Sequence, residues 1–160
     1  MFIGVFTFAD AHREHKAHKH GAAKMAIAFE NMKGKITWEL ASEGVYGFEY
    51  APKTTADKKK QSEGLEKLEK NIDTMIVFAA ENECKITKEK IEVAQHEVGK
   101  HSDIDAAFIV VCKKDPAGSS VTFNIQKYFP KLKDVDVQIL VGEFQKAVEA
   151  NTNSFRVDLK

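Results

Sequence analysis

Strict alternation of apolar and polar residues is the feature that most limits the fold of this chain. A period of two places every second side chain on the same face of a strand. The alternation runs through two stretches separated by the turn segment NMKG, and its apolar members are Met25, Ile27, Phe29, Ile36, Trp38 and Leu40. The two stretches therefore predict a β-hairpin with one buried face.

One segment departs from this pattern and has helical spacing. Thr54 followed three residues later by Asp57 resembles a capping box, the arrangement that begins many helices. Gln61, Leu65, Leu68 and Ile72 then fall on one helical stripe. The spacing predicts an amphipathic helix over 55–72 that covers the sheet.

Further strand patterns follow without regularly alternating helices. They occupy residues 84–97, 103–114, 121–125 and 135–141, with a short helical piece, NIQKYFP, before the last. Because the strands follow one another without a βαβ rhythm, we predict an α+β fold. Its architecture is a mainly antiparallel sheet with one long amphipathic helix packed on it, in a single domain over 24–160.

Charge and hydropathy exclude two classes of partner. The 24 basic and 24 acidic residues cancel and are interleaved, so we expect no nucleic-acid binding. No apolar run approaches the roughly 20 residues of a membrane span. Residues 1–11, MFIGVFTFADA, are apolar and end in a small-x-small site, which predicts a signal-peptide remnant before a His-rich segment over 12–23. The alternative for residues 1–11 is an N-terminal strand.

The two cysteines, Cys84 and Cys112, fit an exported chain. An even cysteine count in an oxidising compartment predicts a disulfide, whereas the alternative is two unlinked core thiols. If 84–97 and 103–114 pair as a hairpin, Cys112 comes close to Cys84, and a β-bulge could align them.

Four of the six histidines lie in the segment HREHKAHKH. His18 and His20 are two apart, so on a strand they share a face and can chelate a metal. The alternative is a solvated basic tail. If cleavage made His12 the first residue, its amine and imidazole could form a copper chelate.

The remaining histidines flank a predicted hairpin turn. His96 and His101 are five residues apart, one too many for the H-E-x-x-H pattern of zinc proteases. A turn at Gly99-Lys100 places His96 opposite Asp103, and a turn at Val98-Gly99 places it opposite His101. In both registers His96, His101 and Asp103 share a face, which suits zinc, although a plain polar sheet face is the alternative.

Sequence templates for catalysis are absent. The chain contains no G-x-S-x-G elbow, no phosphate-binding glycine loop and no G-x-G-x-x-G motif. We therefore expect that the protein is not an enzyme.

Several motifs together resemble the ZrgA-like family of exported bacterial proteins. They are HKHGAAKMAIAFE (18–30), GFEYAP (47–52), KHSDIDAAFIVVC (100–112) and YFPKLKDVDVQIL (128–140). The resemblance implies a periplasmic protein that helps to acquire zinc alongside a transporter, and it points to His18, His20, Glu49 and His101 as ligands. Two features differ from many relatives: the His/Asp-rich insert is reduced to QHEVGKH, and Tyr50 replaces a histidine.

The sequence therefore predicts a periplasmic metal-binding protein. The ion is zinc, with copper as a second choice, and the partner is a periplasmic or inner-membrane transporter. Binding should weaken as the pH falls through about 6.5, where histidine is protonated. The alternative is an envelope interaction module with incidental histidines, in which Tyr128 and Phe129 anchor a partner instead of packing in the core.

Overall fold

Two β-sheets form the framework of the protein. The structure, a computed structural model, describes residues 21–96 and 100–160. The larger sheet has the order β4-β5-β2-β1-β7-β8, and the smaller has the order β3-β6-β9. The strands of the larger sheet are β1 (Ala22–Glu30), β2 (Lys33–Ala41), β4 (Lys85–His96), β5 (His101–Val111), β7 (Asp134–Val141) and β8 (Phe144–Glu149). Those of the smaller sheet are β3 (Ile76–Phe78), β6 (Ser120–Phe123) and β9 (Phe155–Asp158).

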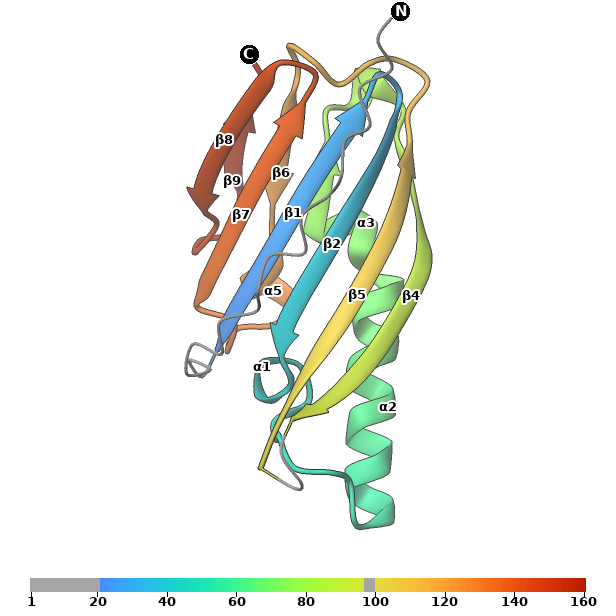
Figure 1. The fold of residues 1–160 in the computed structure, drawn as a ribbon, viewed down its shortest axis with the longest axis vertical. Helices are drawn as coiled ribbons and strands as arrows, with labels where there is room; N and C mark the ends of the chain where they lie inside the picture. Colours follow the sequence, from blue (N-terminus) through green and yellow to red (C-terminus); the bar gives the residue numbers. More distant parts are fainter. Residues whose placement is uncertain (1–20, 97–99) are drawn as a thin grey trace, which may run out of the picture.

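The helices are short and lie on one side of the larger sheet. Behind that sheet, Figure 1 shows the smaller sheet under β7 and β1, and helices α2 and α3 under β5 and β4. The molecule therefore has two layers with the core between them. The helical segments are α1 (Ser42–Tyr46), α2 (Thr55–Lys70), α3 (Ile72–Met75), η1 (Ala80–Asn82) and α5 (Ile125–Tyr128).

The first predicted hairpin is confirmed. Strands β1 and β2 pair antiparallel, with Ile27 opposite Ile36 and Met25 opposite Trp38. The connecting turn has Asn31 at a φ of 55°, a left-handed conformation that asparagine tolerates better than most residues. Strand β1 begins at Ala22, inside the segment predicted over 12–23, while the predicted remnant over 1–11 lies outside the described residues.

The predicted fold class is wrong. The described part of the chain is mostly β, with 48% of those residues in strands and 24% in helices. The larger sheet is mixed because β1 pairs in parallel with β7, and a second sheet, not a helix, covers much of it. No helix among the described residues is longer than the 16 residues of α2.

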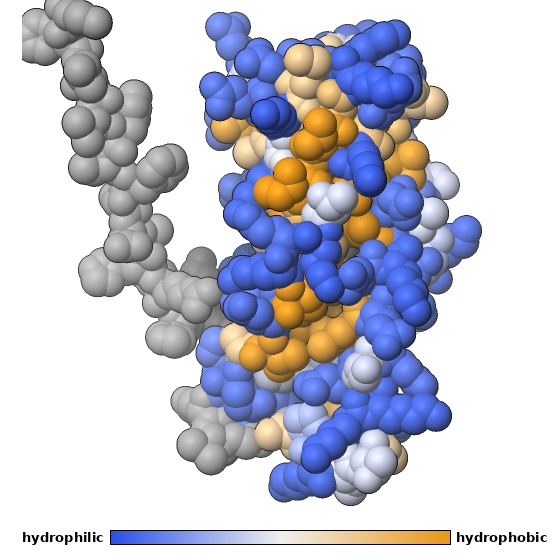
Figure 2. Space-filling model, turned by 90° about the vertical axis from the view of Figure 1, so that its right-hand side faces the viewer, coloured by the Kyte–Doolittle hydropathy of each residue, from blue (hydrophilic) through white to orange (hydrophobic). Residues whose placement is uncertain are grey.

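Helix α2 lies behind β5 and β4, but it covers only this part of the sheet, and few of its side chains are fully buried. Only Gly64 and Leu68 of this helix are buried. Figure 2, which views the side where β4 and α2 lie in Figure 1, shows a hydrophobic band framed by hydrophilic residues. The half-buried apolar residues of these two elements are Leu65, Ile86, Ile91 and Val93. One ion pair, Lys88 Nζ to Glu69 Oε2 at 2.7 Å, joins the two elements.

The start of α2 follows the predicted capping box. The Thr54 side chain accepts a hydrogen bond from Asp57 N at 3.1 Å, and Asp57 Oδ2 accepts one from Thr54 N at 3.0 Å. The backbone amides of Thr54 and Lys53 both donate to the Asp57 carboxylate and lower its pKa, with Thr54 N the main cause. The cap is therefore fully stabilising above the ordinary aspartate pKa, and its contribution is lost as the pH falls through the lowered value.

Replacing Thr54 with alanine should lower the free energy of unfolding by about 1 kcal/mol, because the amide of Asp57 loses its acceptor. Urea denaturation at neutral pH measures the change. The matched control is Thr55→Ala, one residue into the helix, which should change stability much less. Equal losses in the two variants would show that the capping box has no special role.

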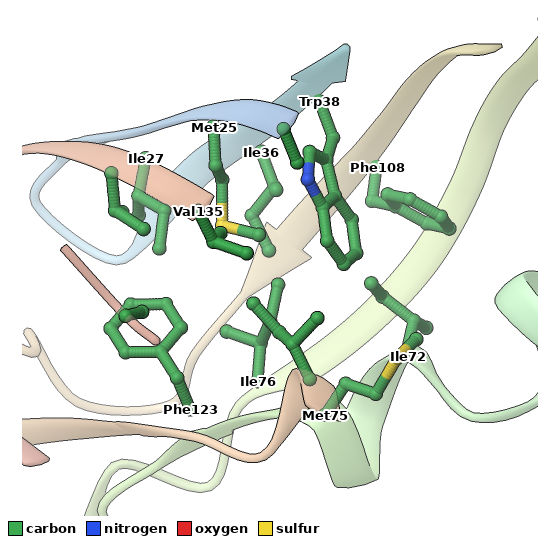
Figure 3. Packing of buried hydrophobic residues seen from close by; sticks show 14 of the residues in the cluster. Met25, Ile27, Ile36, Trp38, Ile72, Met75, Ile76, Phe108, Phe123 and Val135 are labelled. Carbon is green, nitrogen blue, oxygen red and sulfur yellow. The ribbon is translucent and has the colours of Figure 1, made fainter. Parts of the chain in front are cut away.

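The core fills the space between the two layers. Figure 3 shows Met25, Ile27, Ile36 and Trp38 of the larger sheet pointing toward side chains of the second layer. The labelled second-layer residues are Ile72, Met75, Ile76 and Phe123. Phe129 is only 2% exposed and belongs to this core, so it is not available as a partner anchor.

A disulfide joins β4 to the strand end that follows β5. Cys84 and Cys112 form this bond, as predicted. The register of β4 on β5 shifts by one residue between Lys88 and Lys90, and beyond the shift Lys85 pairs with Val111. Adjacent Cys84 therefore lies across from Cys112, and the β-bulge provides the alignment that the disulfide needs.

Candidate metal centre

The end of the β4–β5 hairpin brings two histidines together. His96 is the cross-strand partner of His101, which is the second of the two predicted registers. His96 Nε2 lies 3.0 Å from Asp103 Oδ2. The two side chains therefore lie on the same face of the sheet, as the alternation of side chains along paired strands predicts. The Asp103 side chain is only 8% exposed and the His96 side chain 31%. A shielded carboxylate thus lies beside an accessible imidazole.

The second histidine is paired with a distant part of the chain. His101 Nδ1 lies 2.6 Å from Glu49 Oε2, within hydrogen-bond distance. Glu49 belongs to the connection between α1 and α2, which Figure 1 places beside the end of the hairpin. Its side chain is 11% exposed, whereas that of His101 is 47% exposed. The structure therefore brings predicted residues Glu49 and His101 together across 52 positions.

Aromatic packing fixes the connection that carries Glu49. Phe48 is buried and packs edge-on against Tyr46, with ring centres 4.7 Å apart. On its other side Phe48 stacks on Tyr50, with ring centres 4.6 Å apart. Gly47, at a φ of 94°, ends α1 in the left-handed conformation that favours glycine. Because its neighbours are anchored, Glu49 has a defined position beside the hairpin.

Tyr50 is not arranged as a zinc ligand. Its hydroxyl donates a hydrogen bond to Asp57 Oδ1 at 3.4 Å, at the start of α2. Desolvation, followed by the charge of Asp57 and this hydrogen bond, raises the pKa of Tyr50. The phenol is therefore protonated at neutral pH, a form that binds zinc poorly.

Two histidines and two carboxylates can supply the nitrogen and oxygen ligands that zinc accepts. In the described ranges, however, no three His, Cys, Asp or Glu side chains form a cluster able to hold an ion. The four residues instead form two pairs, His96 with Asp103 and His101 with Glu49. Both cysteine sulfurs are in the disulfide and are not thiolate ligands. The predicted ligands His18 and His20, like His12, lie outside the described residues.

A hollow of about 660 Å³ lies elsewhere, on the outer face of the larger sheet. It is lined by small side chains such as Ala26 and Ala107 and by charges of both signs, including Lys24, Glu39 and Asp105. None of the four paired residues lines it. The hairpin end and the hollow are therefore separate features.

A comparison against protein families identifies the family of the chain. The model described as "ZrgA family zinc uptake protein" matches residues 17–159. The chain belongs to this family. The predicted resemblance to ZrgA-like proteins is thereby confirmed. A comparison with curated proteins finds no match.

One observation bears on where this ZrgA family member is found. The disulfide is compatible with an exported protein, because such bonds persist in oxidising compartments. Within 21–96 and 100–160, no helix is long and apolar enough to cross a bilayer.

Sequence reasoning missed two side chains that join the segments around the Glu49–His101 pair. Gln95 Nε2 lies 2.9 Å from the carbonyl oxygen of His101 and 3.4 Å from that of Glu49. Buried Ser102 lies 3.3 Å from the hydroxyl of Tyr46, hydroxyl to hydroxyl. Strand alternation could have placed Gln95 and Ser102 on one face. Their contacts with Glu49 and Tyr46 depend on a long-range fold that local patterns do not encode.

Proposed function

We propose that this protein is a periplasmic zinc-binding protein that captures the ion and delivers it for uptake. The observation that carries the proposal is the pair of imidazole–carboxylate contacts on facing strands, at 2.6 and 3.0 Å. Membership of a family described by zinc uptake supports the choice of ion. The partner that receives zinc would be a transporter of the inner membrane or the periplasm.

The role of each side chain follows from the chemistry of histidine ligands. In zinc sites, one imidazole nitrogen commonly binds the ion while a carboxylate accepts a hydrogen bond from the other. Glu49 lies at Nδ1 of His101, and Asp103 lies at Nε2 of His96. We assign the metal to the opposite nitrogens, Nε2 of His101 and Nδ1 of His96. Such carboxylates fix the tautomer and orientation of each ring.

Two imidazoles do not complete a tetrahedral zinc site. The sequence offers His18 and His20 as the remaining nitrogen ligands, and water can occupy a position that the protein leaves open. A site with an exchangeable ligand suits a protein that must release its cargo. Reversible ligation by neutral imidazoles, without any chemical transformation, is the proposed mechanism.

Calorimetric titration of the full chain with zinc chloride tests the proposal. Glu49→Gln should lower the zinc association constant by about 10- to 100-fold, because an amide orients His101 less strongly than a carboxylate does. His101→Ala should lower it at least as much. The control is Glu63→Gln on the exposed surface of α2, which removes the same charge from a residue that belongs to neither imidazole–carboxylate pair.

The outcomes separate the two candidate classes. Stoichiometric zinc binding in the wild type and in Glu63→Gln, with weaker binding in the two site variants, supports zinc capture. If the wild type gives no heat at micromolar zinc, or if all four proteins bind equally, the paired histidines are not the site. An interaction module would then be the better description.

A further inference from the structure

Gln95 occupies a central place in the candidate metal centre, although its own side chain is no metal ligand. It is the last residue of β4 before His96, and its cross-strand partner is Ser102, the residue after His101. Successive strand residues point to opposite faces, so Gln95 lies on the face opposite that of the two histidines. From there it supports the site through the backbone.

The amide group of Gln95 contacts two segments of the chain at once. Its Nε2 donates to the carbonyl oxygen of His101 at 2.9 Å and to that of Glu49 at 3.4 Å. A primary amide has two hydrogens, so both bonds can exist together. These carbonyls belong to the two residues whose side chains meet at 2.6 Å. One side chain therefore joins the backbones of both members of the Glu49–His101 pair.

A second set of contacts holds the same connection from the other side. The Tyr50 hydroxyl binds Asp57, whose carboxylate also accepts hydrogen bonds from the backbone amides that begin α2. Tyr50 in turn stacks on Phe48. Glu49 thus lies between an anchor on α2 and an anchor on β4. Gln95 is the anchor that ties it to the hairpin.

Resting on the proposed zinc function, we infer that Gln95 is the positioning residue of this centre and sets its zinc affinity by locking Glu49 against His101. The residue acts as a hydrogen-bond donor. Its removal lets the Glu49 segment move relative to the hairpin, so the carboxylate orients the imidazole less well. Residues that orient metal ligands in this indirect way typically change affinity by about 10- to 100-fold.

Two substitutions separate hydrogen-bond donation from charge. Gln95→Ala removes the amide, and Gln95→Glu keeps the length but replaces the donor by an acceptor that faces two carbonyl oxygens. If Gln95 were an ordinary surface residue, the added negative charge of Gln95→Glu would tighten binding of a divalent cation. The inference predicts the opposite, weaker binding in both variants by about 10-fold. Gln138→Ala, an exposed glutamine of β7, is the matched control and should bind as the wild type does.

A measurement on the metal-free protein tests the role of Gln95 independently of zinc binding. Each carbonyl that Gln95 contacts is conjugated with the next backbone amide, that of Tyr50 or that of Ser102. In spectra of the metal-free protein, the amide signals of Tyr50 and Ser102 should shift in Gln95→Ala and stay in place in Gln138→Ala. Thermal unfolding of all variants establishes that the fold is intact.

The results distinguish this inference from the proposed function. Shifted Tyr50 and Ser102 amides, with weaker zinc binding in both Gln95 variants, support it. If His101→Ala loses zinc but the Gln95 variants bind like the wild type, or if Gln95→Glu binds more tightly, the positioning role is overturned and the zinc function stands. If the wild type does not bind zinc, both proposals fail.

Discussion

Replacing both His96 and His101 with alanine should lower the zinc association constant of the full chain by about 100-fold or more. The two imidazoles face each other on paired strands, and each lies against a carboxylate of low exposure. Removing both takes away two nitrogen ligands and leaves two carboxylates without the rings that they orient. Losing a single orienting partner already costs about 10- to 100-fold, so the loss of two ligands should exceed that.

Competition with a chromophoric zinc chelator measures this change at affinities too high for direct titration. The control replaces two exposed residues at the other end of the same hairpin, Lys85→Ala with Thr87→Ala. It should bind zinc as the wild type does. If the double histidine variant retained the zinc affinity of the wild type, the zinc site would not lie at the hairpin.

Loss of the disulfide should have the largest effect on stability. Cys84 and Cys112 are 28 residues apart. In the chain-entropy model, a cross-link that closes a loop of this size reduces the entropy of the unfolded chain and so stabilises the fold by about 3 to 4 kcal/mol. The double variant Cys84→Ala/Cys112→Ala should therefore unfold at a much lower urea concentration. The core contains many other buried side chains besides Cys112, so the variant should still fold cooperatively.

Reduction of the wild type supplies the control for side-chain replacement. Dithiothreitol should lower the stability of the wild type most of the way to that of the double alanine variant. The stability of the variant should not change. If the oxidised and reduced wild type unfold at the same denaturant concentration, the disulfide does not contribute as argued. Zinc affinity should survive reduction, because the cysteines lie at the opposite end of β4 from His96.

The local parts of the fold were predictable because the alternation of side chains along a strand depends only on neighbouring residues. Alternation through Trp38 placed the first hairpin, and the even spacing of His101 and Asp103 placed them on one face with His96. The hairpin registers also placed Cys112 near Cys84, where a β-bulge could align the two, and the structure has such a bulge between Lys88 and Lys90. These inferences require only that two neighbouring strands pair.

The global arrangement was not predictable in the same way. Parallel pairing of β1 with β7 joins Ala22 to Asp134, and nothing in either strand's alternation specifies that neighbour. Five-residue α1, six-residue β8 and three-residue β3 are too short to give a clear period. The stripe of Gln61, Leu65, Leu68 and Ile72 is helical as predicted, but it is divided between α2, which ends at Lys70, and α3, which begins at Ile72.

The candidate site was predictable only in part for the same reason. The hairpin pair of His96 and Asp103 depends on local register, whereas the pair of His101 and Glu49 was implied by family resemblance and not by spacing. Gln95 escaped notice because an isolated glutamine on a strand has no signature. Its importance arises from two carbonyls that only the folded chain brings within reach of one amide.

Nuclear magnetic resonance of the histidine rings tests the zinc site most directly. In the full chain labelled with ¹⁵N and titrated with zinc chloride, long-range ring correlations identify which nitrogen binds the ion. The account predicts that Nε2 of His101 and Nδ1 of His96 shift together and saturate at a stoichiometric amount of zinc. Ring signals of both residues that stay unchanged at saturating zinc would contradict it.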